Sequence, residues 1–278
     1  MATSNGSNGN NGNDGDNGDG NDGKKATQLL ADAHKTGALS TATMKTLDVV
    51  DLGAQIQAGL GVAVDDVASS EVVLVTMMPD DSGSIAGSGN EAAVRDGHNL
   101  VLDALTSSKQ AGDVFVHTRY LNGQVLFPYV SIDAAVPMDR GNYRADKGTP
   151  LYDQTVVLLG TVIAKAQEFA QAGVPVRTVT LLITDGADAG SRRCKASHVA
   201  ALVEDLRRQE NHVVAAMGIS DGHTDFHKVF RAMGIPDAWI LTPGNTASEI
   251  RKAFRVFSQS AIAATGGAAV TALGGFAN

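Results

Sequence analysis

From residue 71 onward, short runs rich in β-branched residues alternate with longer amphipathic stretches. This alternation is typical of βαβ units, in which helices join parallel strands and cover the faces of one sheet. The predicted strands are Val72–Met78, Val114–Tyr120, Gln124–Tyr129, Thr178–Thr184, Val213–Ile219 and Trp239–Leu241. The predicted helices are Glu91–Ser107, Pro150–Ala172, Ser197–Gln209, Asp225–Met233 and Ala247–Ala264. The pattern predicts an α/β fold around a mostly parallel sheet.

One pair of strands departs from the parallel pattern. The dipeptide Asn122-Gly123 separates the second and third predicted strands. Asn-Gly favours the tight turn of a two-residue β-hairpin, because both positions adopt a positive φ. We therefore expect one antiparallel strand at an edge of the sheet, with helices on both faces.

The rest of the chain divides by composition. We expect four parts: a disordered tail rich in Asn, Gly and Asp, a helical lead-in with Ser40 as a helix cap, the α/β domain and a tail of small residues, spanning residues 1–25, 26–70, 71–264 and 265–278. The acidic run in the first tail resembles a calcium loop only superficially, because its spacing does not match the D-x-D-x-D-G pattern.

Charge and cysteine content limit the partners and the compartment. The formal net charge is −8, which argues against nucleic acid as the main partner. The single cysteine excludes an internal disulfide. The longest apolar stretch, Thr155–Ala164, has about ten residues, whereas a membrane span needs about 20. We expect a soluble cytoplasmic protein without a membrane partner; the sequence does not fix its oligomeric state.

Oxygen-bearing side chains follow the first predicted strand. Asp80, Ser82 and Ser84 form a D-x-S-x-S sequence, which places one carboxylate and two hydroxyls at alternating positions. These hard oxygen donors suit Mg²⁺, Mn²⁺ or Ca²⁺. Asp and Ser are also common turn and helix-cap residues, so this segment alone leaves both interpretations open.

Two distant segments favour a metal site. Thr149 precedes the longest predicted helix, where it is also suited to cap that helix ahead of Pro150. Asp185 follows another predicted parallel strand and precedes a glycine, a common turn position. Because ligands collect at the carboxyl edge of a parallel sheet, we expect all three segments to meet there.

These segments resemble the metal-ion-dependent adhesion site of von Willebrand factor A domains. The resemblance covers about residues 70–260. The chain is most similar to bacterial intracellular proteins of this family. All five motif positions are present, within DDSGS at 80–84, TPLYD at 149–153 and TDG at 184–186. The register makes Asp80 the motif aspartate, because starting at Asp81 would place Gly83 and Ile85 where hydroxyls are needed. We expect Asp81 to add negative potential at the rim.

The resemblance implies a three-layer α/β/α fold and a metal held by Asp80, Ser82, Ser84, Thr149 and Asp185. It implies that the hydroxyls contact the metal directly or through one water, while the aspartates act largely through water. Mg²⁺ is the expected ion, with Mn²⁺ or Ca²⁺ as alternatives. A Glu or Asp of a partner protein would complete the coordination, without catalysis. Related proteins often work beside an AAA+ ATPase or in multiprotein systems.

Two enzyme classes remain as alternatives. A Mg²⁺-dependent phosphohydrolase of the haloacid dehalogenase type needs D-x-D after its first strand, but position 82 is Ser. A nucleotide-binding site would use the G-x-G-x-x-A sequence at residues 87–92. That sequence begins about eight residues beyond the predicted strand end, where we expect a loop instead.

Two smaller features receive simple interpretations. His223 and His227 have the i, i+4 spacing of metal ligands, but Asp225 or Thr224 between them is suited to cap a helix. Cys194 lies between Arg193 and Lys195, so we expect a surface thiol whose pKa these cations could lower.

Overall fold

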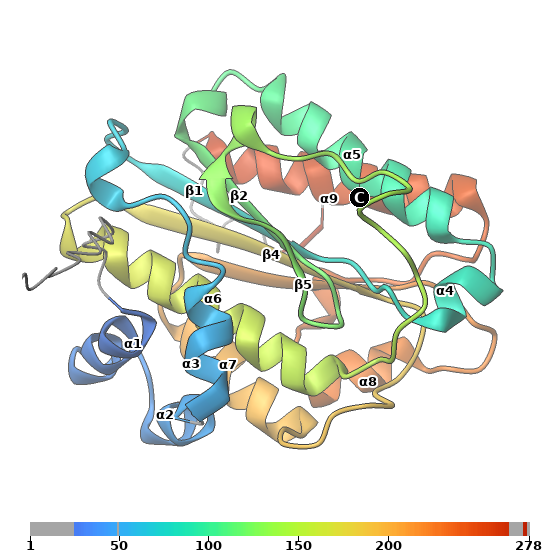
Figure 1. Ribbon diagram of the computed structural model, residues 1–278, viewed down its shortest axis with the longest axis horizontal. Coiled ribbons are helices and arrows are strands. Elements are labelled where there is room, and N and C mark those ends of the chain that lie inside the picture. The colour runs from blue at the N-terminus through green and yellow to red at the C-terminus, as the bar shows by residue number, and fades with distance from the viewer. Residues whose placement is uncertain (1–24, 49, 267–274, 277–278) are drawn as a thin grey trace, which may run out of the picture.

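The computed structural model describes residues 25–48, 50–266 and 275–276 (Figure 1). The predictions for the two tails therefore fall mostly outside the described residues. Within the described residues, the strands form a six-stranded sheet in the order β3-β2-β1-β4-β5-β6. The strands are β1 (Val72–Met78), β2 (Val114–Arg119), β3 (Val125–Ser131), β4 (Val176–Thr184), β5 (His212–Gly218) and β6 (Ile240–Leu241).

The sheet has the predicted mixture of directions. Strand β1 pairs in parallel with β2 and β4, and β5 pairs in parallel with β4 and β6. Among these six described strands, only β3 runs antiparallel, against β2. The turn between them contains Gly123 at φ +96°, and its N–H donates to the carbonyl of Tyr120 at 2.9 Å. The prediction of one antiparallel edge strand after Asn122-Gly123 is confirmed.

Helices cover both faces of the sheet, which completes the predicted three-layer α/β/α arrangement (Figure 1). Alternation along β1 supplies both cores, because successive strand residues point to opposite faces. Val73, Val75 and Met77 pack with helices α5 (Glu91–Thr106) and α9 (Ala247–Thr265). Val72 and Leu74 pack with the other layer. The helices after the lead-in are α4 (Gly83–Gly87), α5 (Glu91–Thr106), α6 (Leu151–Gln171), α7 (Ala196–Arg208), α8 (Phe226–Ala232) and α9 (Ala247–Thr265).

The lead-in covers α6. Its helices are α1 (Ala26–Lys35), α2 (Thr41–Leu47) and α3 (Val50–Gln57). Leu29, Leu47 and Ile56 share a core with residues of α6. Because α6 lies between these helices and the sheet, it is buried around most of its circumference, which explains its apolar sequence. Ser40 caps α2 as predicted, since its Oγ accepts from the Thr43 amide at 3.2 Å.

The lead-in also closes the open edge of β3. The Tyr129 amide donates to the carbonyl of Gly59 at 3.0 Å, and the Val62 amide donates to the carbonyl of Tyr129 at 2.9 Å. Covering an edge strand in this way removes backbone groups that would otherwise pair with another chain. No helix in the described part of the chain is long and apolar enough to cross a membrane.

Candidate metal site

Asp80 and Asp185 lie at the same edge of the sheet. Strands β1 and β4 are neighbours in register, with Met78 opposite Leu182, so the residues that follow both strands emerge together. Both carboxyls are buried, Asp80 at 0% and Asp185 at 2% exposure. The carboxyl ends of adjacent parallel strands thus bring together residues that are distant in sequence.

Asp80 accepts hydrogen bonds through both carboxylate oxygens and through its backbone carbonyl. Its Oδ1 accepts from the Ser82 amide at 2.8 Å, and its Oδ2 accepts from the Thr184 hydroxyl at 2.7 Å. The Tyr143 hydroxyl donates to its backbone carbonyl at 2.5 Å. Burial raises the pKa of this carboxyl, and the hydroxyl donors partly oppose that shift. Asp80 is therefore a fixed acceptor whose negative charge is costly without a nearby cation.

A chain of hydroxyls links the two motif segments. Ser84 Oγ donates to Asp185 Oδ1 at 2.6 Å, and Ser82 Oγ lies 2.8 Å from Ser84 Oγ. Since the single hydroxyl proton of Ser84 goes to Asp185, Ser82 is the donor to Ser84. The four side chains of Asp80, Ser82, Ser84 and Asp185 are thus brought together as the sequence predicts.

One atom of this cluster is unsatisfied. Asp185 Oδ2 is buried and has no hydrogen-bond partner. Burial raises the pKa of Asp185 to about 6, and the neighbouring Asp80 charge contributes to the shift. Buried carboxylate oxygens are almost always paired with a donor or coordinate a metal. The orphaned oxygen beside two serine hydroxyls therefore fits a bound divalent cation.

Thr149 reaches this edge through its backbone. The Gly83 amide donates to the carbonyl of Lys147 at 3.0 Å, and the Ala189 amide donates to the carbonyl of Thr149 at 3.0 Å. Its segment therefore runs between the loop after β1 and the loop after β4. Thr149 does not cap α6, because Pro150 occupies the N-cap position.

The start of α6 is capped by a distant loop that the sequence pattern did not indicate. The Tyr152 amide donates to Asp188 Oδ1 at 3.2 Å, and the Asp153 amide donates to Ser191 Oγ at 3.0 Å. Asp153 in turn accepts from the amides of Arg192 and Cys194 at 2.8 and 2.7 Å. This exchange fixes the loop after β4 against the helix that follows Thr149.

The sequence analysis did not identify two residues that bind Asp80, and it assigned a third residue, Asp81, the wrong position. Thr184 and Tyr143 bind Asp80, but a threonine inside a strand and an isolated tyrosine carry no sequence signal for that role. Asp81 is wrong as a rim residue: it is 2% exposed, and its Oδ1 accepts from the Asn122 amide at 3.0 Å. Its side chain faces the β2–β3 hairpin and borders a small cavity there.

The donor set is dominated by hydroxyls. Within the described residues, no group of three or more His, Cys, Asp or Glu side chains is placed to hold a metal. The site at the sheet edge instead combines the carboxyls of Asp80 and Asp185 with the hydroxyls of Ser82 and Ser84. Such hard, partly neutral donors fit Mg²⁺ or Mn²⁺, which keep several water ligands.

The alternative motifs do not form their sites. The G-x-G-x-x-A sequence joins the end of α4 to the start of α5, since Gly87 ends α4 and Glu91 begins α5, and it is not a tight turn directly after β1. Asp225 caps α8 as predicted, because its Oδ1 accepts from the Lys228 amide at 3.0 Å. The Nδ1 atom of His227 lies 3.3 Å from Oδ1 of Asp237, so this histidine pairs with an aspartate rather than with His223.

The prediction of a surface thiol is wrong. Cys194 is 7% exposed, and burial together with the neighbouring Asp153 raises its pKa to about 11. The loop that Asp153 holds places the cysteine against α6 and α7, so the adjacent cations do not activate it.

The fold has counterparts among solved structures. The pilus adhesin SpaC from Lactobacillus rhamnosus GG matches with a TM-score of 0.50 at 15% identity, over 69% of this chain and 30% of SpaC. A von Willebrand factor type A protein from Catenulispora acidiphila matches with a TM-score of 0.47 at 19% identity, over 70% and 43% of the two chains. Manganese-loaded TRAP protein from Plasmodium vivax matches with a TM-score of 0.41 at 17% identity, over 66% and 73%.

The likeness shows the fold alone. With the strand order and the antiparallel edge strand, it confirms a three-layer α/β fold around a mostly parallel sheet. The chain spans less than a third of the length of SpaC. No protein-family model matches the sequence, and no curated protein matches it either.

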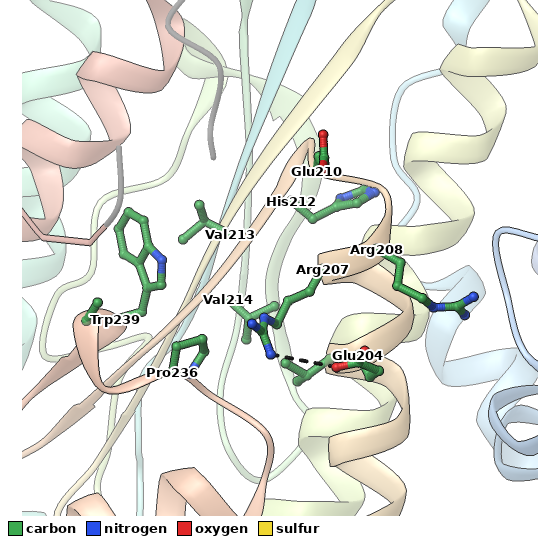
Figure 2. A pocket seen from close by; sticks show the side chains of 11 residues that line it. Glu204, Arg207, Arg208, Glu210, His212, Val213, Val214, Pro236 and Trp239 are labelled. Carbon is green, nitrogen blue, oxygen red and sulfur yellow. Dashed lines mark ion pairs between the residues drawn. The ribbon is translucent and has the colours of Figure 1, made fainter. Parts of the chain in front are cut away.

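One cavity lies away from the metal site. It has a volume of about 370 Å³ and borders the first residues of β5, between the end of α7 and Trp239. Figure 2 shows Val213 and Val214 between Trp239 on one side and Arg207 with Glu204 on the other. The metal site lies at the opposite, carboxyl edge of the sheet, after β1 and β4.

Proposed function

We propose that this chain is a divalent-cation-dependent protein-interaction module. Its metal would be held by Asp80, Ser82, Ser84, Thr149 and Asp185. The observation that carries this proposal is Asp185 Oδ2, a buried carboxylate oxygen without a partner beside the linked serine hydroxyls. A cation there would satisfy that oxygen and offset the charge of two buried aspartates.

The donor set indicates what the bound ion would do. Its direct protein ligands would be mainly neutral hydroxyls, so the ion would keep a strong attraction for an additional anionic oxygen. A Glu or Asp side chain of a partner protein would supply that oxygen and complete the coordination. We propose Mg²⁺ as the ion, because its octahedral shell accommodates hydroxyls and waters together.

We further propose binding without catalysis, in the cytoplasm, with a protein partner such as an AAA+ ATPase or a member of a multiprotein system. The net charge of −8 disfavours nucleic acid, and the single cysteine suits a reducing compartment. A phosphate-ester assay with Mg²⁺ tests the absence of catalysis: turnover that is lost in Asp80→Asn would contradict it.

Metal binding is tested first on the purified chain. Isothermal titration with Mn²⁺ should show one site in the wild type, weakened about tenfold or more in Ser84→Ala and Asp185→Asn. Ser88→Ala is the matched control, because Ser88 is exposed and lies outside the motif. Equal Mn²⁺ affinity in all four proteins would overturn the proposed site.

Partner binding is tested by capture from native cell extract. We expect a partner that the wild type retains in Mg²⁺ and releases in EDTA, and that Asp80→Ala does not retain. A partner retained under all three conditions would show that binding uses another surface, which would overturn the proposed mechanism.

A further inference from the structure

A second cavity lies directly beside the candidate metal site. It has a volume of about 210 Å³ and is bordered by Asp81, by Tyr120 and Asn122 of the β2–β3 hairpin, and by the segment from Gly141 to Lys147. Asp81 stands between the motif residues Asp80 and Ser82, so one stretch of backbone forms both the metal site and this cavity. A partner bound at the metal would place a neighbouring residue over it.

The cavity is bordered by a tyrosine whose buried hydroxyl has no hydrogen-bond partner. Tyr120 is 2% exposed, and its hydroxyl has no hydrogen-bond partner. Its ring is held against Tyr143, with 5.5 Å between the ring centroids, and Tyr143 is itself fixed by its bond to Asp80. A buried hydroxyl that is rigidly positioned and unpaired marks a place where a ligand atom would be satisfied.

The same cavity offers an acceptor. The Asp81 carboxyl accepts one bond, from the Asn122 amide to Oδ1, and a carboxylate has capacity for further donors. A ligand group that uses both features must accept a hydrogen bond from Tyr120 and donate one to Asp81. A primary carboxamide does both through its carbonyl and its NH₂ group.

The charged side chains that line the cavity balance, Asp81 and Asp146 against Arg144 and Lys147, which favours a neutral ligand group over a charged one. A carboxylate would meet the buried Asp81, which repels it. An ammonium or guanidinium group would pass Arg144 and Lys147, both exposed at the mouth, where Lys147 pairs with Asp146 at 2.8 Å. A neutral group with both a donor and an acceptor meets neither obstacle.

We propose that this cavity is a specificity pocket for an Asn or Gln side chain, next to the acidic residue that a partner presents to the metal. The proposal rests on the proposed function, because it takes the partner to be oriented by its metal-bound carboxylate. It adds a chemical class for the partner: an acidic residue adjacent to an amide residue.

Capped dipeptides that combine Asp with Gln, in both orders, test this pocket against matched dipeptides of Asp with Ala. Binding to the full chain in Mg²⁺ is measured by nuclear magnetic resonance titration. We expect at least one Gln peptide to bind the wild type about fivefold more tightly than its Ala counterpart. In Tyr120→Phe this preference should disappear. A wild type without the preference, or a preference that survives in Tyr120→Phe, overturns the proposal.

Two controls show whether a preference lost in Tyr120→Phe comes from the pocket or from damage to the metal site or the fold. Tyr120→Phe should keep the Mn²⁺ affinity and the melting temperature of the wild type, because the hydroxyl it removes has no partner in the protein. Tyr129→Phe is the matched control, since its hydroxyl bonds Thr76 at 2.5 Å far from the cavity and should not alter the preference.

The last arm separates failure of this inference from failure of the proposed function. N-acetylglutamine amide, which lacks a carboxylate, is titrated in EDTA while the ring resonances of Tyr143, which packs against position 120 and is present in both proteins, are followed. Shifts that Tyr120→Phe abolishes support the pocket even if Mn²⁺ titration finds no metal site. No shift at saturating amide, together with normal Mn²⁺ binding, overturns the pocket and leaves the metal site standing.

Discussion

At the scale of single residues, burial decides the chemistry of the site. Asp80, Asp81 and Asp185 are each at most 2% exposed, and burial raises the pKa of each carboxyl. Three neighbouring carboxyls in this state are unfavourable as anions, and a cation or a proton relieves the cost. Proton and metal therefore compete for the same oxygens.

This competition predicts the pH dependence of stability in EDTA. Burial raises the pKa of Asp185 from its ordinary value of 3.8 to about 6, so the folded state holds this proton more tightly. The stabilising contribution of that proton is present below about pH 4 and is lost as the pH rises through 6. Urea unfolding should thus show the wild type losing stability relative to Asp185→Asn between pH 4.5 and about 7. A relative gain over that window would contradict the assignment.

At the scale of elements, the loop after β4 is fixed by one aspartate at the start of α6. Asp153 accepts from the backbone amides of Arg192, Arg193 and Cys194. The same loop donates to the carbonyl of Thr149, so the two ends of the candidate site depend on this arrangement. Local packing of a loop thereby determines where a motif threonine lies.

Asp153→Ala tests that dependence. Loss of the shared acceptor leaves several backbone amides unpaired, so we expect a destabilisation of about 2–3 kcal/mol in urea unfolding. Mn²⁺ affinity should fall as well, because Thr149 loses its fixed position. Asp103→Ala, at an exposed position of α5, is the control and should change stability by less than about 0.5 kcal/mol. Unchanged metal affinity in Asp153→Ala would show that the loop does not position Thr149.

The lead-in depends on a glycine at its contact with β3. Gly61 has φ +64°, and a Cβ there would lie 1.9 Å from the carbonyl oxygen of Tyr129. Gly37 also has a positive φ, of +81°, but its surroundings are open.

We expect Gly37→Ala to cost about 1 kcal/mol from backbone strain alone, and Gly61→Ala to cost at least about twice as much, because the backbones must separate. Chemical denaturation of the two variants measures this difference. Equal costs would show that the lead-in does not need close contact with β3.

At the scale of the whole molecule, the candidate site joins segments that are far apart in sequence. The bond from Ser84 to Asp185 spans 101 residues, and the metal site forms only when β1 and β4 are paired. A cation that binds these residues together therefore binds the folded state and not the unfolded chain.

Mg²⁺ should consequently raise the melting temperature of the chain. At a concentration 100 times the dissociation constant the expected stabilisation is about 2.7 kcal/mol. Differential scanning calorimetry in Mg²⁺ and in EDTA measures the shift, and Asp80→Ala should show none. A shift of equal size in Asp80→Ala would place the stabilising ion elsewhere.

Local patterns in the sequence determined the elements and the membership of the site. Runs of β-branched residues define β1 and β4 within two residues of their observed ends, and Asn122-Gly123 marks the antiparallel hairpin. The D-x-S-x-S sequence and Asp185 follow strands that must share an edge once the sheet is parallel. These features depend on residues close together in sequence, which is why they are readable there.

The tertiary structure alone decided which polar groups are covered and which are left unpaired. The burial of Asp81 and Cys194, the orphaned oxygen of Asp185 and the unpaired hydroxyl of Tyr120 each depend on surfaces brought by distant segments. Thr149 illustrates the same limit, because a loop some 40 residues away caps the helix that the threonine itself is suited to cap. Burial and pairing are properties of packed surfaces, and no local pattern encodes them.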